Sequence, residues 1–115
     1  MQKNVFEEIK RINKYGSEYW LARELAKVLE YKDFSNFENA IQKAKTACEN
    51  SKQDIHTHFG DITEMVMIGS GAERPFPSYA LSRYACYLII QNADPSKEAA
   101  DNAGVENYGK FQNYG

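Results

Sequence analysis

The sequence predicts a small α+β domain, and three observations lead to this class. Apolar residues recur every three or four positions in several segments of the 115-residue chain, which is typical of amphipathic helices around one core. A run of strand-forming residues from Thr63 to Ile68 is followed by Gly69-Ser70-Gly71 and a second extended run from Arg74 to Leu81, which indicates a β-hairpin. Hydrophobic residues make up 43% of the chain, enough for a folded core. We therefore expect one domain with a small antiparallel sheet.

The N-terminal segment from Val5 to Ile12 is predicted to form a short amphipathic helix, because its apolar residues fall on one helical side. Asn13 to Ser17 then carries a turn signal. The aromatic stretch Glu18-Tyr19-Trp20 suits a short strand that leads into the central part of the chain.

The stretch from Trp20 to Cys48 predicts two helices joined by a short polar turn. Its first half places one apolar row on a helical face, made of Leu21, Leu25, Val28 and Leu29. Its second half forms a continuous apolar stripe of Phe34, Phe37, Ile41, Ala44 and Cys48. Such a pair resembles a helix-turn-helix, whose second helix can enter a DNA major groove.

The outer face of the second helix supplies the candidate DNA contacts. Asn and Gln can pair with adenine, and Lys can bind guanine or phosphate. Lys43 shares a side with Asn36 and Asn39, whereas Lys45 points about 200° away and lies nearer Gln42. The candidate nucleic-acid-binding residues, including two outside the helix, are Asn36, Asn39, Gln42, Lys43, Lys45, Lys52 and Arg74. On spacing alone, a helix pair that only builds a core is the commoner explanation.

The segment after this pair offers weak signals for other chemistry. His56 and His58 lie near Asp54 and Asp61, and on a strand both imidazoles would share a face. No third His or Cys follows at metal-site spacing, so surface histidines are the better interpretation. The glycine loop before Arg74 lacks the Gly-Lys-Ser/Thr ending of a nucleotide-hydrolase phosphate loop. We expect no catalytic residue, metal or cofactor.

The end of the chain predicts an edge strand, a hydrophobic helix and a tail. Pro75 and Pro77 cannot donate ladder hydrogen bonds, so their strand is expected at an edge or only partly paired. Ser82 is a suitable N-cap for an apolar helix that ends before Asp94-Pro95. Apolar residues extend beyond one face of this helix, which predicts that it is central or lies at an interface, and we expect a homodimer. Residues 98–115 are expected to be a tail, disordered or docked at an interface.

Charge and cysteine usage limit the function classes. The net charge of −2 argues against a protein that coats nucleic acid by bulk electrostatics, so any DNA contact must be local. Cys48 and Cys86 are predicted to be buried, unpaired thiols, as in a reducing compartment. The sequence shows no membrane-length apolar run and no signal-peptide core, and we expect a cytoplasmic protein.

Three segments identify a family. They are FEEIKRI, WLARELAKVLEY and LSRYACYLIIQNADPSK, and they resemble the bacterial DNA-damage-inducible protein D family. The N-terminal part of that family is similar to the BRO N-terminal domain of baculovirus repeated proteins and phage antirepressors. The resemblance covers nearly all of residues 5–97, so residues 1–97 are expected to form a BRO N-terminal-like domain. It implies an α+β domain, DNA binding, expression in the SOS response to DNA damage and no catalytic residues.

The chain departs from this family in two places. Glu30 stands where the family often has Gly, so the turn after the first helix of the pair is expected to differ. Family members also continue into a longer chain after Lys97, so we expect this sequence to be either a form shortened on the C-terminal side or a fragment of a longer protein. The expected function is a non-enzymatic DNA-binding or DNA-transaction regulator of the DNA-damage response. The alternative is a module that binds recombination or repair proteins without reading DNA, and the balanced charge favours it.

Overall fold

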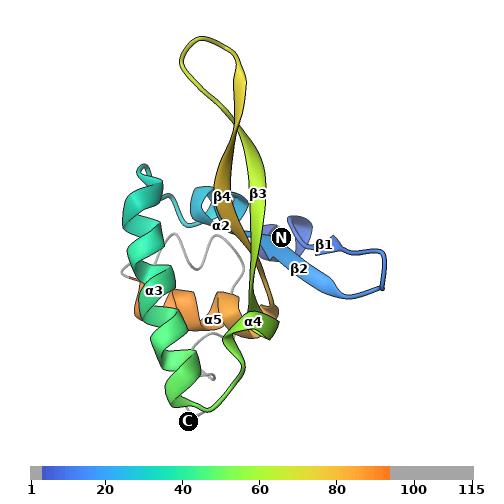
Figure 1. Cartoon of the computed structure of the whole chain (residues 1–115), viewed down its shortest axis with the longest axis vertical. Coiled ribbons are helices and arrows are strands. Elements are labelled where there is room, and N and C mark those ends of the chain that lie inside the picture. The colour runs from blue at the N-terminus through green and yellow to red at the C-terminus, as the bar shows by residue number, and fades with distance from the viewer. Residues whose placement is uncertain (1–3, 94–115) are drawn as a thin grey trace.

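The computed structural model of this chain describes residues 4–93 and confirms the α+β class. The described strands form one antiparallel sheet in the order β1-β2-β4-β3, and the helices pack beside it (Figure 1). Along the chain the elements are α1 (Val5–Glu8), β1 (Arg11–Ile12), β2 (Glu18–Leu21), α2 (Ala22–Val28), α3 (Phe34–Asn50), α4 (Ile55–His58), β3 (Phe59–Met67), β4 (Glu73–Leu81) and α5 (Arg83–Asn92). The expected tail at 98–115 lies outside the described residues.

The N-terminal helix is shorter than the periodicity predicts, and Ile12 is part of a strand. The side chain of Asn13 accepts hydrogen bonds from the backbone N–H groups of Tyr15 (2.9 Å) and Ser17 (3.0 Å), and Gly16 adopts a φ of 83°. This turn chemistry folds Ile12 against Glu18 in the β1–β2 hairpin. A local turn thus overrides a helical pattern that was only a few residues long.

The predicted β-hairpin is confirmed and is longer than expected. Strand β3 begins at Phe59 rather than at Thr63, and it pairs with β4 along the whole length of both strands. The connecting turn is closed by a hydrogen bond from the Ile68 N–H to the Ala72 carbonyl (2.8 Å), and Gly71 adopts a φ of 84° there. The distal half of the hairpin projects beyond the helices (Figure 1).

Strand β4 lies between β2 and β3 rather than at an edge, but it is only partly paired on its β2 side, which is the other arrangement that its prolines predict. Strand β2 pairs with it only at Ala80 and Leu81. Over the rest of β4, the edge that faces away from β3 has no partner strand in the described part of the chain. Pro75 and Pro77 lie in this half-free region, which tolerates residues that cannot donate a ladder hydrogen bond.

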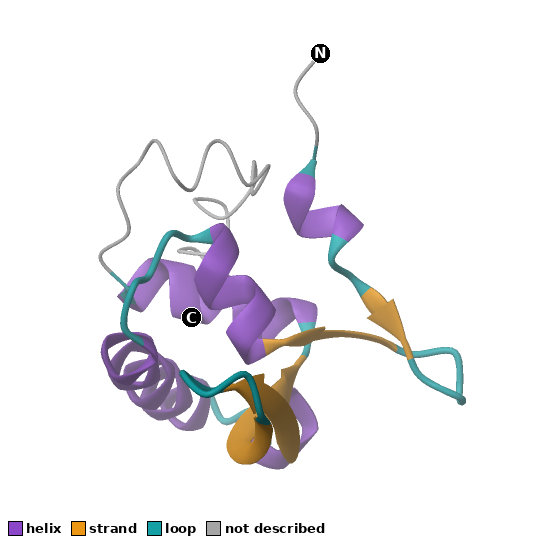
Figure 2. Ribbon diagram, turned by 90° about the horizontal axis from the view of Figure 1, so that it is seen from above, coloured by secondary structure: helices purple, strands orange, loops and turns teal. Residues whose placement is uncertain are grey.

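The core lies where the helices meet the base of the sheet and includes Trp20 of β2, whereas the turn between β1 and β2 projects away from the helices (Figure 2). Phe6 stacks on Trp20 with ring centroids 4.5 Å apart, and the Trp20 Nε1–H donates to the Phe6 carbonyl at 2.8 Å. Helix α3 buries its predicted stripe at Phe37, Ile41, Ala44 and Cys48, together with Ala40. Phe34 is only partly buried at the start of that stripe.

Helix α5 is central to this core. Its Ser82 N-cap is confirmed, since the hydroxyl oxygen accepts the Ala85 N–H at 3.0 Å. Every residue from 85 to 90 is buried, as expected for a central helix whose apolar residues extend beyond one face. The chain itself therefore covers α5. The exposed apolar surface from which we expected a homodimer is not present on this helix. None of the described helices is long and apolar enough to cross a membrane.

The turn after α2 corrects the expectation for Glu30. Glu30 adopts a left-handed φ of 64°, its N–H donates to the Lys27 carbonyl (3.0 Å), and the Tyr31 N–H donates to the Ala26 carbonyl (2.9 Å). These two bonds define the Schellman helix ending that normally contains Gly. Glu30 therefore adopts the turn that Gly would form, and the turn does not differ as we expected. Helix α3 ends in the same way at Lys52, with a φ of 61°.

Candidate nucleic-acid interface

The predicted helix pair consists of the seven-residue α2 and the 17-residue α3. Asp33 begins α3 as its N-cap, with its carboxylate accepting the Ser35 N–H at 2.9 Å. The buried stripe of α3 packs on α5, so the polar side chains of α3 remain at the surface. The sequence-predicted contact residues of α3 fall into two groups on that surface.

The first group is Asn36, Asn39 and Lys43, which we call the α3 face. These three exposed side chains line one shallow depression whose other wall comes from Tyr31, after α2, and Asn92, at the end of α5. The side chain of Lys43 makes no ion pair or hydrogen bond among the described residues. The α3 face therefore presents two amides and one free ammonium group together.

The second group, Gln42 and Lys45, lies against the hairpin. The Lys45 Nζ is 3.2 Å from the Tyr79 Oη and 4.4 Å from the centre of the tyrosine ring. The Gln42 Nε2 donates to the same oxygen at 3.3 Å. Both side chains thus help to pack α3 on β4.

The remaining two candidates lie apart from the α3 face. Lys52 follows the C-terminal end of α3. Arg74 is near the tip of the hairpin, where it pairs with Val66. The structure therefore does not bring all of the predicted cations to one surface.

A polar network that the sequence did not reveal fixes the middle of the hairpin to α2. The Arg23 guanidinium lies 3.9 Å from the centre of the Phe34 ring and donates to the Pro77 carbonyl at 3.1 Å. The Arg23 N–H donates to the Glu64 carboxylate at 3.3 Å, and the buried Ser78 hydroxyl donates to the same carboxylate. Residues so far apart in the chain carry no shared local signal, which is why spacing alone missed this network.

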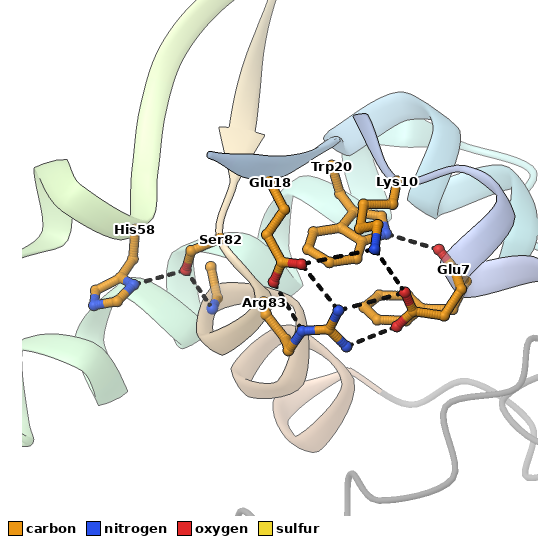
Figure 3. Close-up of polar contacts among 9 residues, drawn as sticks. Glu7, Lys10, Glu18, Trp20, His58, Ser82 and Arg83 are labelled. Atoms are coloured by element: carbon orange, nitrogen blue, oxygen red, sulfur yellow. Dashed lines mark hydrogen bonds and ion pairs between the residues drawn. The ribbon is translucent and has the colours of Figure 1, made fainter. Parts of the chain in front are cut away.

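Arg83 forms a second network, which joins three elements (Figure 3). Its guanidinium lies 2.7 Å from Glu7 of α1 and 2.8 Å from Glu18 of β2, and it lies 5.0 Å from the Trp20 ring centre. Hydrogen bonds from Arg83 lower the pKa of both carboxyl groups. Lys10 lies 3.3 Å from Glu7. Arg83 and Lys10 thus hold the N-terminal arm, which we define as residues 4–18, and are engaged in ion pairs rather than available to a ligand.

The two histidines lie on α4 rather than on a strand, because Asp54 caps this short helix through the His56 N–H at 3.1 Å. Residues two positions apart on a helix point in different directions, so the imidazoles do not share a face. His56 is exposed, whereas the His58 Nδ1 lies 2.6 Å from the Ser82 Oγ (Figure 3). Burial lowers the pKa of His58. In the region that the structure covers, no three His, Cys, Asp or Glu side chains lie together as a metal site would require.

A groove lies on the other side of Tyr31, between α2 and the distal part of β3. Tyr31 lines this groove as well as the depression of the α3 face. Lys27 and Lys32 line it too, and neither side chain has an ion-pair or hydrogen-bond partner among residues 4–93. Neither lysine could be assigned to a groove from the sequence, because the opposite wall comes from the distant strand β3.

Comparisons with known proteins agree with the resemblance. Residues 8–103 match the BRO family, N-terminal domain. The chain is 52% identical over 92 residues to DNA damage-inducible protein D of Escherichia coli (strain K12). That alignment covers 80% of this chain but 34% of the relative, so the chain spans about a third of the relative's length. No solved structure matches the chain. Because the family match includes α2, α3, the hairpin and α5, this chain belongs to the BRO family through its N-terminal domain.

Proposed function

We propose that this domain is a non-enzymatic DNA-binding regulator of the bacterial DNA-damage response and that the α3 face contacts duplex DNA. The observation that carries the proposal is the division of the α3 cations. Lys43 is exposed beside Asn36 and Asn39 and has no ion-pair or hydrogen-bond partner within residues 4–93, whereas Lys45 contacts Tyr79. Membership in the BRO family and the name of the relative, DNA damage-inducible protein D, support the choice of ligand and process.

The chemistry of the α3 face suits a local DNA contact. Amide side chains can form paired hydrogen bonds with adenine, and an ammonium group can bind a phosphate. One free lysine is a small electrostatic contribution, and the chain has a net charge of −2. Binding should therefore be weak, strongly dependent on salt, and sensitive to the loss of single contacts.

The test is a fluorescence-anisotropy titration of duplex DNA at two salt concentrations. The double variant Lys43→Glu with Asn39→Ala should weaken binding more than Lys45→Glu, which makes the same charge change on the other side of α3. Each lost phosphate contact should lower the salt slope by about one unit. The double variant His56→Ala with His58→Ala, and added chelator, should leave binding unchanged. Equal losses from the Lys43 and Lys45 variants would contradict the α3 face as the binding surface.

A second candidate function is binding of recombination or repair proteins without direct DNA contact. The hairpin supports it, because Met65, Met67 and Phe76 are 59%, 69% and 36% exposed, respectively. Exposed apolar side chains on a projecting element are typical of a protein-binding surface. Absence of salt-dependent DNA binding by the folded chain would favour this function over the first.

A further inference from the structure

The groove between α2 and β3 has an open strand edge as one wall. Four consecutive residues of β3, Glu64 to Met67, line it, and no β4 residue does. Successive side chains of a strand point to opposite faces, so a cavity that meets all four must run along the edge of the strand. Strand β3 is the last strand of the sheet, and this edge has no partner strand within residues 4–93.

This edge lacks most of the features that usually prevent strand addition, although β3 carries the acidic residues Asp61 and Glu64. Edge strands are commonly protected by Pro, by Lys or by a short length. Strand β3 has nine residues and contains no Pro, Lys or Arg, whereas the half-free edge of β4 carries Pro75 and Pro77. The backbone donors and acceptors on the outer edge of β3 are therefore available to an extended chain.

The opposite wall of the groove is positively charged. Lys27 and Lys32 line it and have no partner in the described part of the chain, and Arg23 lies beside Phe34. The two carboxylates of the groove are already engaged. Glu24 accepts two hydrogen bonds from Arg11, each at 3.0 Å, and Glu64 accepts from Ser78 and from the Arg23 N–H. Glu30 and Glu73 are exposed nearby but do not line the groove.

We propose that this groove binds an extended acidic segment of a partner protein, which adds to the free edge of β3 as an antiparallel or parallel strand. Main-chain hydrogen bonds to β3 would hold the segment, as in other cases of strand addition beside a helix. Its alternate side chains would lie near Lys27 and Lys32, where Asp or Glu is complementary. The others would lie along the exposed Met65 and Met67 on the opposite face of β3. The groove, of about 360 Å³, has room for a few residues.

The probe is a labelled eight-residue peptide that alternates Glu and Val, titrated against the whole chain by fluorescence anisotropy. A peptide that alternates Lys and Val tests charge selectivity. Two further Glu/Val peptides carry N-methyl groups at either the odd or the even positions. Only every second N–H of an added strand faces its partner strand, so one N-methylated peptide should lose at least tenfold in affinity while the other still binds.

The protein variants test the charged wall. Lys27→Glu with Lys32→Glu should abolish binding of the Glu/Val peptide and create binding of the Lys/Val peptide. Lys14→Glu with Lys52→Glu makes the same change in net charge away from the groove and should preserve the original selectivity. The inference is overturned if the Glu/Val peptide does not bind, if both N-methylated peptides bind equally, or if the two double variants behave alike. Sedimentation of the free chain that shows β3-mediated self-association would also overturn it, because a second copy would then occupy the edge.

Discussion

Two helices of this domain end at a charged residue in a conformation that favours glycine. Glu30 and Lys52 have positive φ values, and each allows the Schellman hydrogen bonds that satisfy the last carbonyls of its helix. An L-residue in this conformation is destabilised by roughly 1–2 kcal/mol. The hydrogen bonds and the packing of α2 and α3 must offset that strain.

Replacing Glu30 with Gly should therefore stabilise the domain. Relief of the strain exceeds the added entropy of Gly in the unfolded chain, so we expect Glu30→Gly to raise the free energy of unfolding by about 0.5–1 kcal/mol. Urea denaturation would measure this as a higher midpoint with an unchanged slope. Glu30→Ala removes the same charge but keeps a Cβ, so it should give no gain. Equal stabilisation by both variants would show that charge, not backbone strain, matters at this position.

His58 should make stability depend on pH between neutral and mildly acidic conditions. Burial lowers its pKa below the ordinary value of 6.5, so the folded state favours the neutral ring. A lowered histidine pKa means that the unfolded state binds the proton more tightly. The contribution of neutral His58 to the free energy of unfolding is therefore complete above about pH 6.5. It is lost as the pH falls from there through the folded-state pKa.

Urea denaturation at pH 7.5 and pH 5 would test this dependence. His58→Gln should remove the part of the pH dependence that falls in this window, whereas the exposed His56→Gln should retain it. Glu7 and Glu18 have lowered pKa values, so their contributions persist until the pH falls below about 4.5. A His58→Gln variant that keeps the full dependence at pH 5–7 would assign it to another group.

Arg83 of α5 joins this helix to α1 and β2 through Glu7 and Glu18. Its side chain is 35% exposed, so solvent screens these ion pairs in part. We expect Arg83→Gln to lower the free energy of unfolding by about 1–2 kcal/mol. The single tryptophan, Trp20, lies next to this network, and its fluorescence should report loosening of the N-terminal arm.

Arg11 provides the matched control for that variant. Its ion pair with Glu24 has similar geometry, at 3.0 Å, but its side chain is 49% exposed and it joins only β1 and α2. Arg11→Gln should change stability by less than about 0.5 kcal/mol and leave Trp20 fluorescence unchanged. Similar effects of the two variants would show that Arg83 acts as an ordinary surface charge.

The sequence predicted the long elements well because each has a repeated pattern. The α3 stripe, the hairpin and the Ser82 cap of α5 were all legible from spacing and turn residues. The short elements were not. Four-residue α1 and α4 are defined by the hydrogen-bonding side chains of Asn4 and Asp54, and such caps outweigh a brief apolar period.

The candidate site was predictable only within one element. Helical geometry alone separated Lys43 from Lys45, and the structure agrees, since only Lys45 meets Tyr79. The groove at β3 was not predictable, because its lysines and its strand edge come from distant segments. Their proximity depends on how the hairpin twists over α2, and periodicity carries no information on that angle.

The reactivity of the two buried cysteines measures how often the core of the whole domain opens. Cys48 of α3 and Cys86 of α5 are buried and unpaired, and burial raises the pKa of both thiols. Reaction of the native protein with a thiol reagent should be slow and become complete on denaturation. Because α3 and α5 share one core, Cys48→Ala and Cys86→Ala variants should each leave one thiol that labels only through global unfolding. Fast labelling of either thiol in the folded protein would contradict this packing.

Tyr31 lines both the depression of the α3 face and the groove at β3, and it packs edge-on against Phe37 with ring centroids 5.0 Å apart. One side chain thus forms part of the wall of two surfaces that we assign to different ligands. If a bound duplex shifts the position of this ring, the affinity of the groove for its peptide must change, and linkage requires the peptide to change the affinity for the duplex by the same factor. The position of the Tyr31 ring would then couple the two surfaces, so that a ligand bound to one changes the affinity of the other for its own ligand.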